Sequence, residues 1–277
     1  MPSTQDLRPL DMPGAKHDTT LFRSFQIQCR VVGALLMREI ITRYGRHNVG
    51  FLWIFFEPMS FTLGVTALWN VAKFNHGSNL SITAFAVTGY STILLWRNTA
   101  NRCALAILPN HSLLYHRNVR VIDLFLARAI LEASGATMSF LFLSVFFIAV
   151  GLMEPPQDIL LILIGWVYLT IFAVGLGFII GSLSEISETY DRIWHTVAYL
   201  LFPLSGAAFM VEWLPVRAQQ VVTWIPTVYG CEMIRAGYFG SLVKPHYEVG
   251  YMIVADLVTL FMGLVMVKYV SARVEPE

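Results

Sequence analysis

The sequence has few charged residues. Asp, Glu, Lys and Arg make up 13% of its 277 residues, whereas 56% are hydrophobic and the mean hydropathy is +0.61. A typical soluble domain contains about 25% charged residues. The shortage therefore excludes an ordinary water-soluble protein and predicts a membrane protein. The net charge of +1 says little about partners, so the distribution of charge along the chain matters more.

Cysteines and the common catalytic motifs are also scarce or absent. Cys29, Cys103 and Cys231 lie far apart with no CxxC pair, so neither a disulfide framework nor a metal site is predicted. The sequence contains no GxxxxGK[ST], HExxH or GxSxG motif. We therefore expect no catalytic residues, metal or cofactor in this chain, and an energy source in a gradient or another subunit. No cleaved signal peptide is expected either.

The chain does contain long hydrophobic runs, which we compare with the roughly 20 apolar residues that cross a membrane. They predict an all-α integral membrane fold with six transmembrane helices. The predicted segments are a cytoplasmic tail (1–19), an amphipathic interface helix (20–47) and a membrane domain (48–277), with spans at about 49–71, 81–100, 128–152, 158–183, 193–211 and 249–269. Between the spans we predict a cytoplasmic loop (97–127), a short acidic loop (184–192) and re-entrant or extracellular helices (212–248).

The basic residues predict the orientation of these spans. If both termini are cytoplasmic, all but four of the nineteen Lys and Arg residues lie on the inner side. The four exceptions are Lys73, Arg217, Arg235 and Lys244. Inner segments of membrane proteins carry an excess of Lys and Arg, so the sequence favours cytoplasmic N- and C-termini.

The junction from Met37 to Pro58 (MREIITRYGRHNVGFLWIFFEP) passes from basic to aromatic sequence. The residues before the junction are candidates for a mouth that gathers an anionic substrate: Arg38, Arg43, Tyr44 and Arg46. Ordinary positive-inside anchoring explains the same arginines. The preceding helix has Phe22, Phe25, Cys29, Val32, Leu36 and Ile40 on one face. It lies in the membrane interface or packs on protein.

Several residues inside the spans have both a structural and a functional interpretation. Glu57, Glu132 and Asp256 either find structural partners, as Glu132 would with Arg128, or take part in proton or substrate transfer. The aromatic side chains either pack or line a channel for sugar rings. The channel candidates are Trp53, Phe55, Glu57, Phe61, Tyr199 and Phe202. Gly177 and Gly181 permit two helices to approach closely. Packing within the chain is the simpler interpretation, and packing between two chains is the alternative.

Three segments resemble a known family. The pattern formed by Arg38, Glu39, Arg43, Tyr44, Gly50, Trp53, Glu57 and Pro58 resembles the opening segment of type-2 ABC exporter permeases. Ile225–Gly240 (IPTVYGCEMIRAGYFG) is similar to the extracellular helices of that family. Ser112–Arg128 (SLLYHRNVRVIDLFLAR) resembles the branch that exports capsular polysaccharide. The likeness covers nearly the whole chain after residue 20.

The resemblance implies the pore-forming subunit of an ATP-driven exporter of lipid-linked acidic capsular polysaccharide in the bacterial inner membrane. It implies a homodimer docked on two cytoplasmic ATP-binding subunits, which hold the ATP and Mg. The resemblance also implies that the polysaccharide is handed to a periplasmic co-polymerase and an outer-membrane export protein. The implied ATPase-coupling residues are Arg30, Asn110, His111, Tyr115, His116 and Arg117. The implied extracellular helices carry Trp213, Pro215, Pro226, Glu232 and Arg235.

Other functions remain open from the sequence. An exporter of O-antigen, teichoic acid, drugs or lipids would belong to the same superfamily. A membrane enzyme acting on lipid-linked sugars would need an acidic pair such as DxD, which the sequence lacks. A secondary transporter would show repeated halves and aligned intramembrane charges, which we do not find. No basic or aromatic pattern predicts a nucleic-acid partner.

Overall fold

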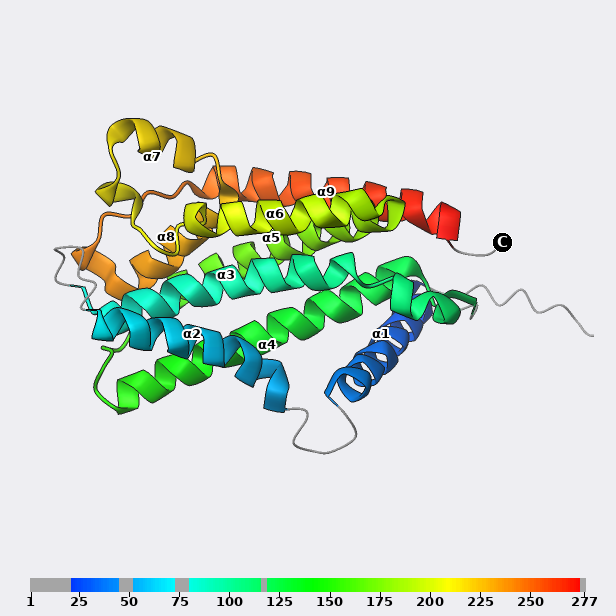
Figure 1. Cartoon of the computed structure of the whole chain (residues 1–277), viewed down its shortest axis with the longest axis horizontal. Helices are drawn as coiled ribbons and strands as arrows, with labels where there is room; N and C mark the ends of the chain where they lie inside the picture. Colours follow the sequence, from blue (N-terminus) through cyan, green and yellow to red (C-terminus); the bar gives the residue numbers. More distant parts are fainter. Residues whose placement is uncertain (1–20, 45–51, 73–79, 116–118, 275–277) are drawn as a thin grey trace, which may run out of the picture.

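The computed structural model describes residues 21–44, 52–72, 80–115 and 119–274, and these ranges contain helices and turns but no β-strand. An elongated bundle runs along the long axis of the molecule (Figure 1). Its helices are α2 (Trp53–Val71), α3 (Ile82–Ala104), α4 (Val121–Ala149), α5 (Ile159–Ile186), α6 (Glu188–Leu204) and α9 (Val249–Val274). Helices α4, α5 and α9 are long and apolar enough to cross a membrane by length and composition.

Shorter elements cover the two ends of the bundle. Helix α1 (Leu21–Tyr44) and the 3₁₀ helix η2 (Leu108–Tyr115) lie at the end where α9 finishes (Figure 1). The remaining elements lie at the opposite end: η3 (Val211–Trp213), α7 (Val216–Val222), α8 (Pro226–Phe239) and η4 (Gly240–Leu242). Helix α8 is buried along most of its length and packs on α3 and α5. The two ends therefore carry different structures on one common bundle.

Helix α5 lies at the centre, because it packs on α3, α4, α6, α8 and α9. Glycines allow this close packing. A Cβ added at Gly177 would lie 2.9 Å from Cys103 Sγ, and one at Gly181 would lie 2.8 Å from the Cys103 carbonyl oxygen. Gly177 and Gly181 thus serve packing within the chain, as the simpler interpretation of their spacing predicted. Gly175 meets the backbone of α9 in the same way.

The predicted loop 97–127 is wrong in its bounds. Helix α3 continues to Ala104 and α4 already begins at Val121, so the connection is only 105–120. Within this connection the 3₁₀ helix η2 ends at Tyr115, and α4 begins at Val121. Arg120 and Asp123 form a capping box there, with the Arg120 backbone N–H donating to Asp123 Oδ2 at 3.0 Å. Capping lets the helix begin well before its apolar stretch.

The predicted acidic loop 184–192 is also wrong. Helix α5 extends to Ile186 and α6 starts at Glu188, so only Ser187 separates them. The Ser187 hydroxyl caps α6 by accepting a hydrogen bond from the Thr189 N–H at 3.2 Å. Glu188 and Asp191 lie in the first turn of α6, where negative charge is favourable to the helix dipole. Acidic residues that indicate a loop by composition therefore form a helix start.

Helix α1 packs on protein through its second half, and its position in a membrane interface stays a prediction. Its second half packs on α4 and buries Val32 and Leu35. Its first half leaves Phe22 and Phe25 exposed at 70% and 65%. Exposed aromatic side chains on such a helix suit the boundary of a bilayer.

Replacing Gly175 by Ala should destabilise the bundle. The added Cβ would lie 2.8 Å from the Leu260 backbone nitrogen, so α5 and α9 must separate. We expect a loss of about 1–3 kcal/mol, measured as a lower Tm of the purified protein in detergent. Gly64→Ala is the matched control, because nothing lies within 4 Å of its added Cβ. Equal Tm values for the two variants would contradict the close packing of α5 on α9.

Candidate functional site

Four charged side chains meet near the end of the bundle that carries α1, and we call them the ionic cluster: Arg43, Glu57, Arg102 and Glu132. Glu132 of α4 is at the centre, with a side chain only 11% exposed. It accepts a hydrogen bond from Arg43 Nη1 of α1 and lies 3.6 Å from Arg102 Nε of α3. Two helices far apart in sequence are therefore held on one carboxylate.

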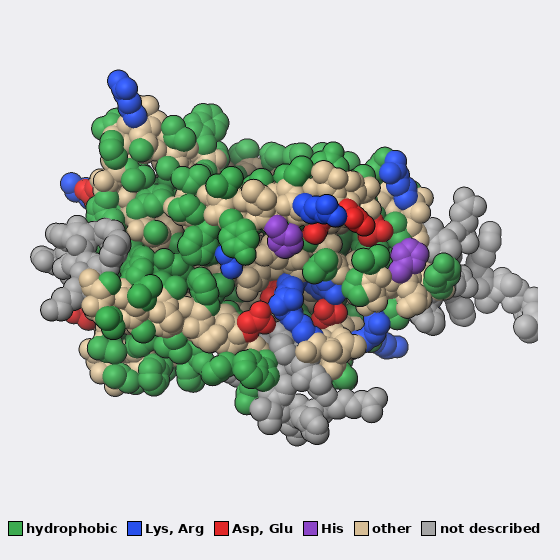
Figure 2. All heavy atoms as spheres, in the orientation of Figure 1, with side chains coloured by type: hydrophobic (Ala, Val, Ile, Leu, Met, Phe, Trp, Pro, Cys, Tyr) green, Lys and Arg blue, Asp and Glu red, His purple; other side chains and the backbone are tan. Residues whose placement is uncertain are grey.

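Glu57 closes the ionic cluster from the start of α2. Its carboxylate accepts a hydrogen bond from Arg102 Nη2 at 3.1 Å and lies 3.8 Å from Arg43 Nη2. Two acids and two bases thus alternate, and the formal charges balance. Figure 2 shows acidic and basic side chains gathered in one region of a face that is otherwise largely hydrophobic. The ionic cluster joins α1, α2, α3 and α4.

An ion pair and a hydrogen bond beside the ionic cluster also hold α1 against its neighbours. Arg128 Nη2 of α4 lies 3.2 Å from Glu39 Oε1 of α1. Arg38 Nη1 donates to Asn110 Oδ1 at 2.5 Å, which ties α1 to η2. Coulomb attraction is stronger away from bulk water, but an unpaired charge there is costly. Arg128 and Glu39 therefore depend on each other, as do the members of the ionic cluster.

The structure gives two of the predicted mouth residues internal partners. Arg38 is bonded to Asn110 and Arg43 belongs to the ionic cluster, so substrate is not needed to explain their positions. Arg46 lies outside the described residues, and only the backbone of Tyr44 is described. Gathering of an anionic substrate at this mouth stays a prediction.

Of the predicted ATPase-coupling residues that the structure describes, one is buried and three are exposed. Asn110 is buried and its side-chain amide donates to the Ala106 carbonyl oxygen at 2.9 Å. Arg30, His111 and Tyr115 are exposed, and the rings of His111 and Tyr115 lie 6.2 Å apart. His116 and Arg117 lie outside the described residues. The end of the molecule near α1 thus presents a polar and aromatic surface supported by Asn110.

A chain of aromatic contacts, which we call the aromatic row, crosses α2, α3 and α6 toward η3. Phe202 packs on Phe61 and Tyr90 with ring centroids 6.4 and 5.8 Å apart. Trp69 lies 5.4 Å from Tyr90 and 5.9 Å from Phe85. Phe85 then stacks on Trp213 at 5.1 Å. The ring contacts are therefore continuous from Phe61 and Phe202 to Trp213.

The predicted channel candidates are placed differently with respect to this row. Phe61 and Phe202 belong to it, and Tyr199 is exposed on α6. Trp53 is exposed and packs edge-on against Phe56, whereas Glu57 is in the ionic cluster. The side chain of Phe55 is not described. Channel lining remains a prediction for all of these candidates.

The end of the bundle opposite α1 is organised by Arg235 of α8, which has no exposed surface. Its Nη1 donates to the carbonyl oxygens of Gly206 and Phe209, both at 2.6 Å, and its Nη2 donates to the carbonyl oxygen of Ala207. The guanidinium also lies over the Phe85 ring at 3.7 Å. Arg235 thus fixes the backbone that follows α6, which the sequence did not reveal.

Glu232 performs the complementary task one turn earlier in α8. Its carboxylate accepts hydrogen bonds from the backbone N–H groups of Val211 and His246, both at 3.1 Å. The other residues predicted for the extracellular helices mark element boundaries: Trp213 ends η3, Pro215 caps α7 and Pro226 is the first residue of α8. Their location outside the membrane stays a prediction.

The three predicted intramembrane acids have different environments. Glu57 and Glu132 have arginine partners, which accounts for them structurally. The predicted pairing of Glu132 with Arg128 is wrong, because the partners are Arg43 and Arg102. Asp256 is 7% exposed, and its Oδ2 has no hydrogen-bond partner among the described residues. For Asp256 both the structural and the proton-transfer interpretations remain.

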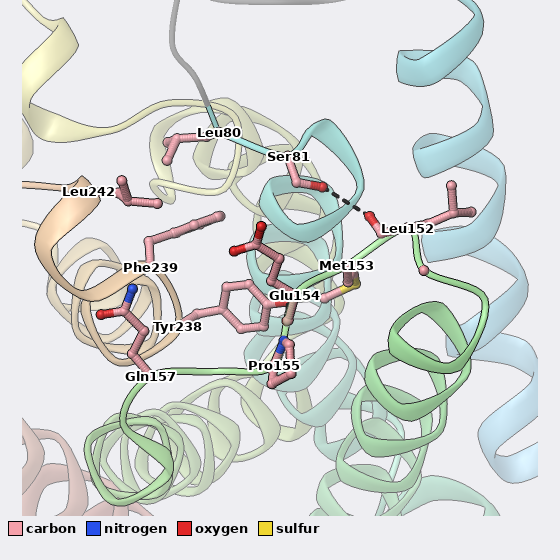
Figure 3. Close-up of a pocket in the computed structure, with 11 residues that line it drawn as sticks. Leu80, Ser81, Leu152, Met153, Glu154, Pro155, Gln157, Tyr238, Phe239 and Leu242 are labelled. Atoms are coloured by element: carbon pink, nitrogen blue, oxygen red, sulfur yellow. Dashed lines mark hydrogen bonds between the residues drawn. The ribbon is translucent and has the colours of Figure 1, made fainter.

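One cavity of about 350 Å³ opens beside α8 at the end away from the ionic cluster. In Figure 3 the Glu154 carboxylate and the Gln157 amide point toward the space beside Phe239. The Tyr238 hydroxyl donates to the Glu154 carbonyl oxygen, and Ser81 Oγ donates to Leu152 O at 3.1 Å. These bonds fix the connection from α4 to α5. No sequence pattern pointed to the residues of this cavity.

The three long apolar helices are typical of a helical membrane protein. A profile of the ABC-2 type transporter family matches residues 30–239, and the chain belongs to this family.

Similar proteins include three that are named for the export or transport of polysaccharides. The capsule polysaccharide export inner-membrane protein CtrC of Neisseria meningitidis serogroup B is 46% identical over 263 residues, covering 95% of this chain and 99% of that protein. The capsule polysaccharide export inner-membrane protein BexB of Haemophilus influenzae is 43% identical, covering 94% and 98%. The polysialic acid transport protein KpsM of Escherichia coli is 26% identical, covering 87% and 94%.

Replacing Glu132 by Gln should destabilise the protein. The change removes the more buried of the two carboxylates that Arg43 and Arg102 share and leaves them only Glu57, so we expect a loss of about 1–3 kcal/mol. Thermal unfolding of the purified protein should therefore show a clearly lower Tm. Glu188→Gln is the control, because Glu188 forms an exposed pair with Arg192 and such pairs contribute little. A Tm loss for Glu132→Gln as small as that of the control would contradict the role of the ionic cluster.

Proposed function

We propose that this chain is the membrane subunit of an ATP-driven exporter that moves a lipid-linked acidic capsular polysaccharide across the bacterial inner membrane. The similarity to CtrC carries this proposal, because 46% identity extends over nearly the full length of both proteins. The names of CtrC and BexB state capsule polysaccharide export and an inner-membrane location. The acidic and lipid-linked nature of the substrate comes from the family resemblance.

The proposed topology has six spans and cytoplasmic termini. Helices α4, α5 and α9 have the required length and hydropathy, and α2, α3 and α6 complete the bundle beside them. Helices α3 and α6 are less apolar than α4, α5 and α9, which suits helices that face a translocation path rather than lipid. The α1 end carries Arg38, Arg43 and Arg128, so the excess of basic residues favours a cytoplasmic position for it.

The proposed ATP-binding partner docks at this cytoplasmic end. Leu108 and Tyr115 of η2 are 76% and 71% exposed, and His111 is exposed between them. Two ATP-binding subunits would hold the ATP and Mg and drive two copies of this chain. The bond from Arg38 to Asn110 would transmit movement of η2 to α1. This chain itself would carry no catalytic step.

The aromatic row supports passage of a sugar chain. Flat rings contact sugar faces without a charged binding site, which allows a polymer to slide. Phe61 is 38% exposed and Tyr199 is 73% exposed, so this face is open in the single chain. A second copy would enclose it. A periplasmic co-polymerase and an outer-membrane export protein would then receive the polymer.

Deletion of the gene in its source bacterium tests the export function. Surface polysaccharide should disappear while polymer accumulates inside the cell, because synthesis continues without a path outward. Staining of intact and permeabilised cells with a polymer-specific lectin or antibody would measure both pools. Expression of the wild-type chain should restore the surface pool. Normal surface polysaccharide in the deletion strain would refute the proposed function.

Replacing Leu108 and Tyr115 together by Ser should weaken docking of the ATP-binding subunit. The change removes exposed apolar surface at η2 without touching the buried Asn110. We expect a severalfold lower yield of the ATP-binding subunit when the tagged membrane chain is purified. Trp224→Ser is the control, since Trp224 is 77% exposed at the opposite end of the bundle. Equal recovery with both variants would place docking elsewhere.

A further inference from the structure

Arg97 is an arginine without a carboxylate partner in the interior of α3. The arginine ion pairs among the described residues involve Arg43, Arg102, Arg128 and Arg192 but not Arg97. The Arg97 side chain is partly buried, and its Nε is buried with no hydrogen-bond partner in the described part of the chain. No carboxylate among the described residues therefore compensates its charge.

The guanidinium of Arg97 lies at the start of the aromatic row. Its Cζ is 5.5 Å from the centre of the Phe202 ring on α6. Helices α3 and α6 run antiparallel, and the Trp194 indole N–H donates to Asn101 Oδ1 at 2.7 Å. Arg97 is one turn beyond Asn101, and Phe202 is two turns beyond Trp194, in the direction away from the ionic cluster. The charge thus projects along the bundle toward the rings.

In the proposed topology, Arg97 lies deeper in the second span than Arg102. Arg102 is five residues nearer the end of α3, about 7 Å along the helix axis, and it pairs with Glu57 and Glu132 in the ionic cluster. A charged side chain farther inside a membrane helix is costly and marks a substrate or ion pathway by default. A cation retained there without an acid leaves its charge available to a ligand.

We propose that Arg97, beside the Phe202 ring, forms a subsite for an anionic group of the transported molecule. The group is a sugar carboxylate or a phosphate of the lipid end. Guanidinium pairs with both through parallel hydrogen bonds from its two terminal nitrogens, and its flat face rests on an aromatic ring. The proposal rests on the export function above and adds the residue that recognises the negative charge.

The aromatic row gives this subsite a direction. From Phe202 the rings continue through Tyr90 and Trp69 to Phe85. Beyond Phe85 the next guanidinium belongs to Arg235, whose hydrogen bonds go to three backbone carbonyl groups. An anionic group therefore meets one available cation, at Arg97, before sugar rings reach the neutral aromatic surface.

Binding of three probes to the purified exporter in nanodiscs tests the proposal. The exporter contains this chain and its ATP-binding subunit. The probes are a fluorescent oligosialic acid without lipid, the same oligomer with its carboxyl groups reduced to alcohols, and the reduced oligomer carrying a lipid phosphate. Fluorescence anisotropy at constant ionic strength gives each Kd. One charge-assisted pair is expected to favour an anionic probe about tenfold or more over the neutral probe.

Arg97→Gln should abolish this preference and leave the Kd of the neutral probe unchanged. Arg97→Lys should keep part of the preference, and Arg192→Gln, an exposed arginine on α6, should behave as the wild type. The anionic probe that loses affinity identifies the source as carboxylate or phosphate. If Arg97→Gln does not assemble, Phe202→Leu keeps the charge, removes the neighbouring ring and should reduce the preference by a smaller factor.

If Arg97→Gln still prefers the anionic probe over the neutral one, the subsite is refuted. If Arg97→Gln does not assemble, the same result in Phe202→Leu refutes it. The subsite is equally refuted if all three probes weaken to the same extent, or if the wild type does not distinguish charged from neutral probes. These outcomes differ from failure of the export function, in which the wild-type chain would not restore surface polysaccharide to the deletion strain.

Discussion

Charge compensation at Glu132 is the interaction on which one half of the structure depends. The carboxylate lies on α4 and receives Arg43 from α1 and Arg102 from α3, while Glu57 of α2 balances the second positive charge. An unpaired charge at such a site is strongly destabilising. The position of α1 on the bundle is therefore fixed by electrostatics as well as by the few apolar side chains that α1 buries.

In the opposite half of the bundle, backbone groups outside the helices need hydrogen-bond partners. The segment from Ser205 to Met210 follows α6 without helical hydrogen bonds, and several of its carbonyl oxygens lie in buried surroundings. Arg235 donates to three of those carbonyls, and Glu232 accepts two backbone N–H groups. Buried backbone polar groups outside a helix require such partners. One acidic and one basic residue on α8 thus stabilise the non-helical chain around it.

Much of the helical architecture follows from hydrophobic runs in the sequence, but partners across the sequence do not. The apolar stretches locate α4, α5 and α9 well, and the Gly177–Gly181 spacing correctly indicates packing within the chain. Helix ends are less predictable, because caps at Asp123 and Ser187 extend helices into polar sequence. The partner of Glu132 was missed since Arg43 is 89 positions away and Arg128 is on the same helix face. A single sequence carries no signal for such distant pairs.

The helices of the bundle differ in the side chains that they expose or bring together. Helices α4 and α9 expose large apolar side chains such as Phe142, Val145 and Phe261, which suit contact with lipid. Helices α2, α3 and α6 instead bring together the aromatic row, part of the ionic cluster and Arg97. All arginines of the ionic cluster are neutralised within the fold, and neutralised charges hold helices rather than bind ligands. The charge of Arg97, by contrast, lies beside the Phe202 ring without a carboxylate partner in the described part of the chain, which leaves it available to the proposed anionic ligand.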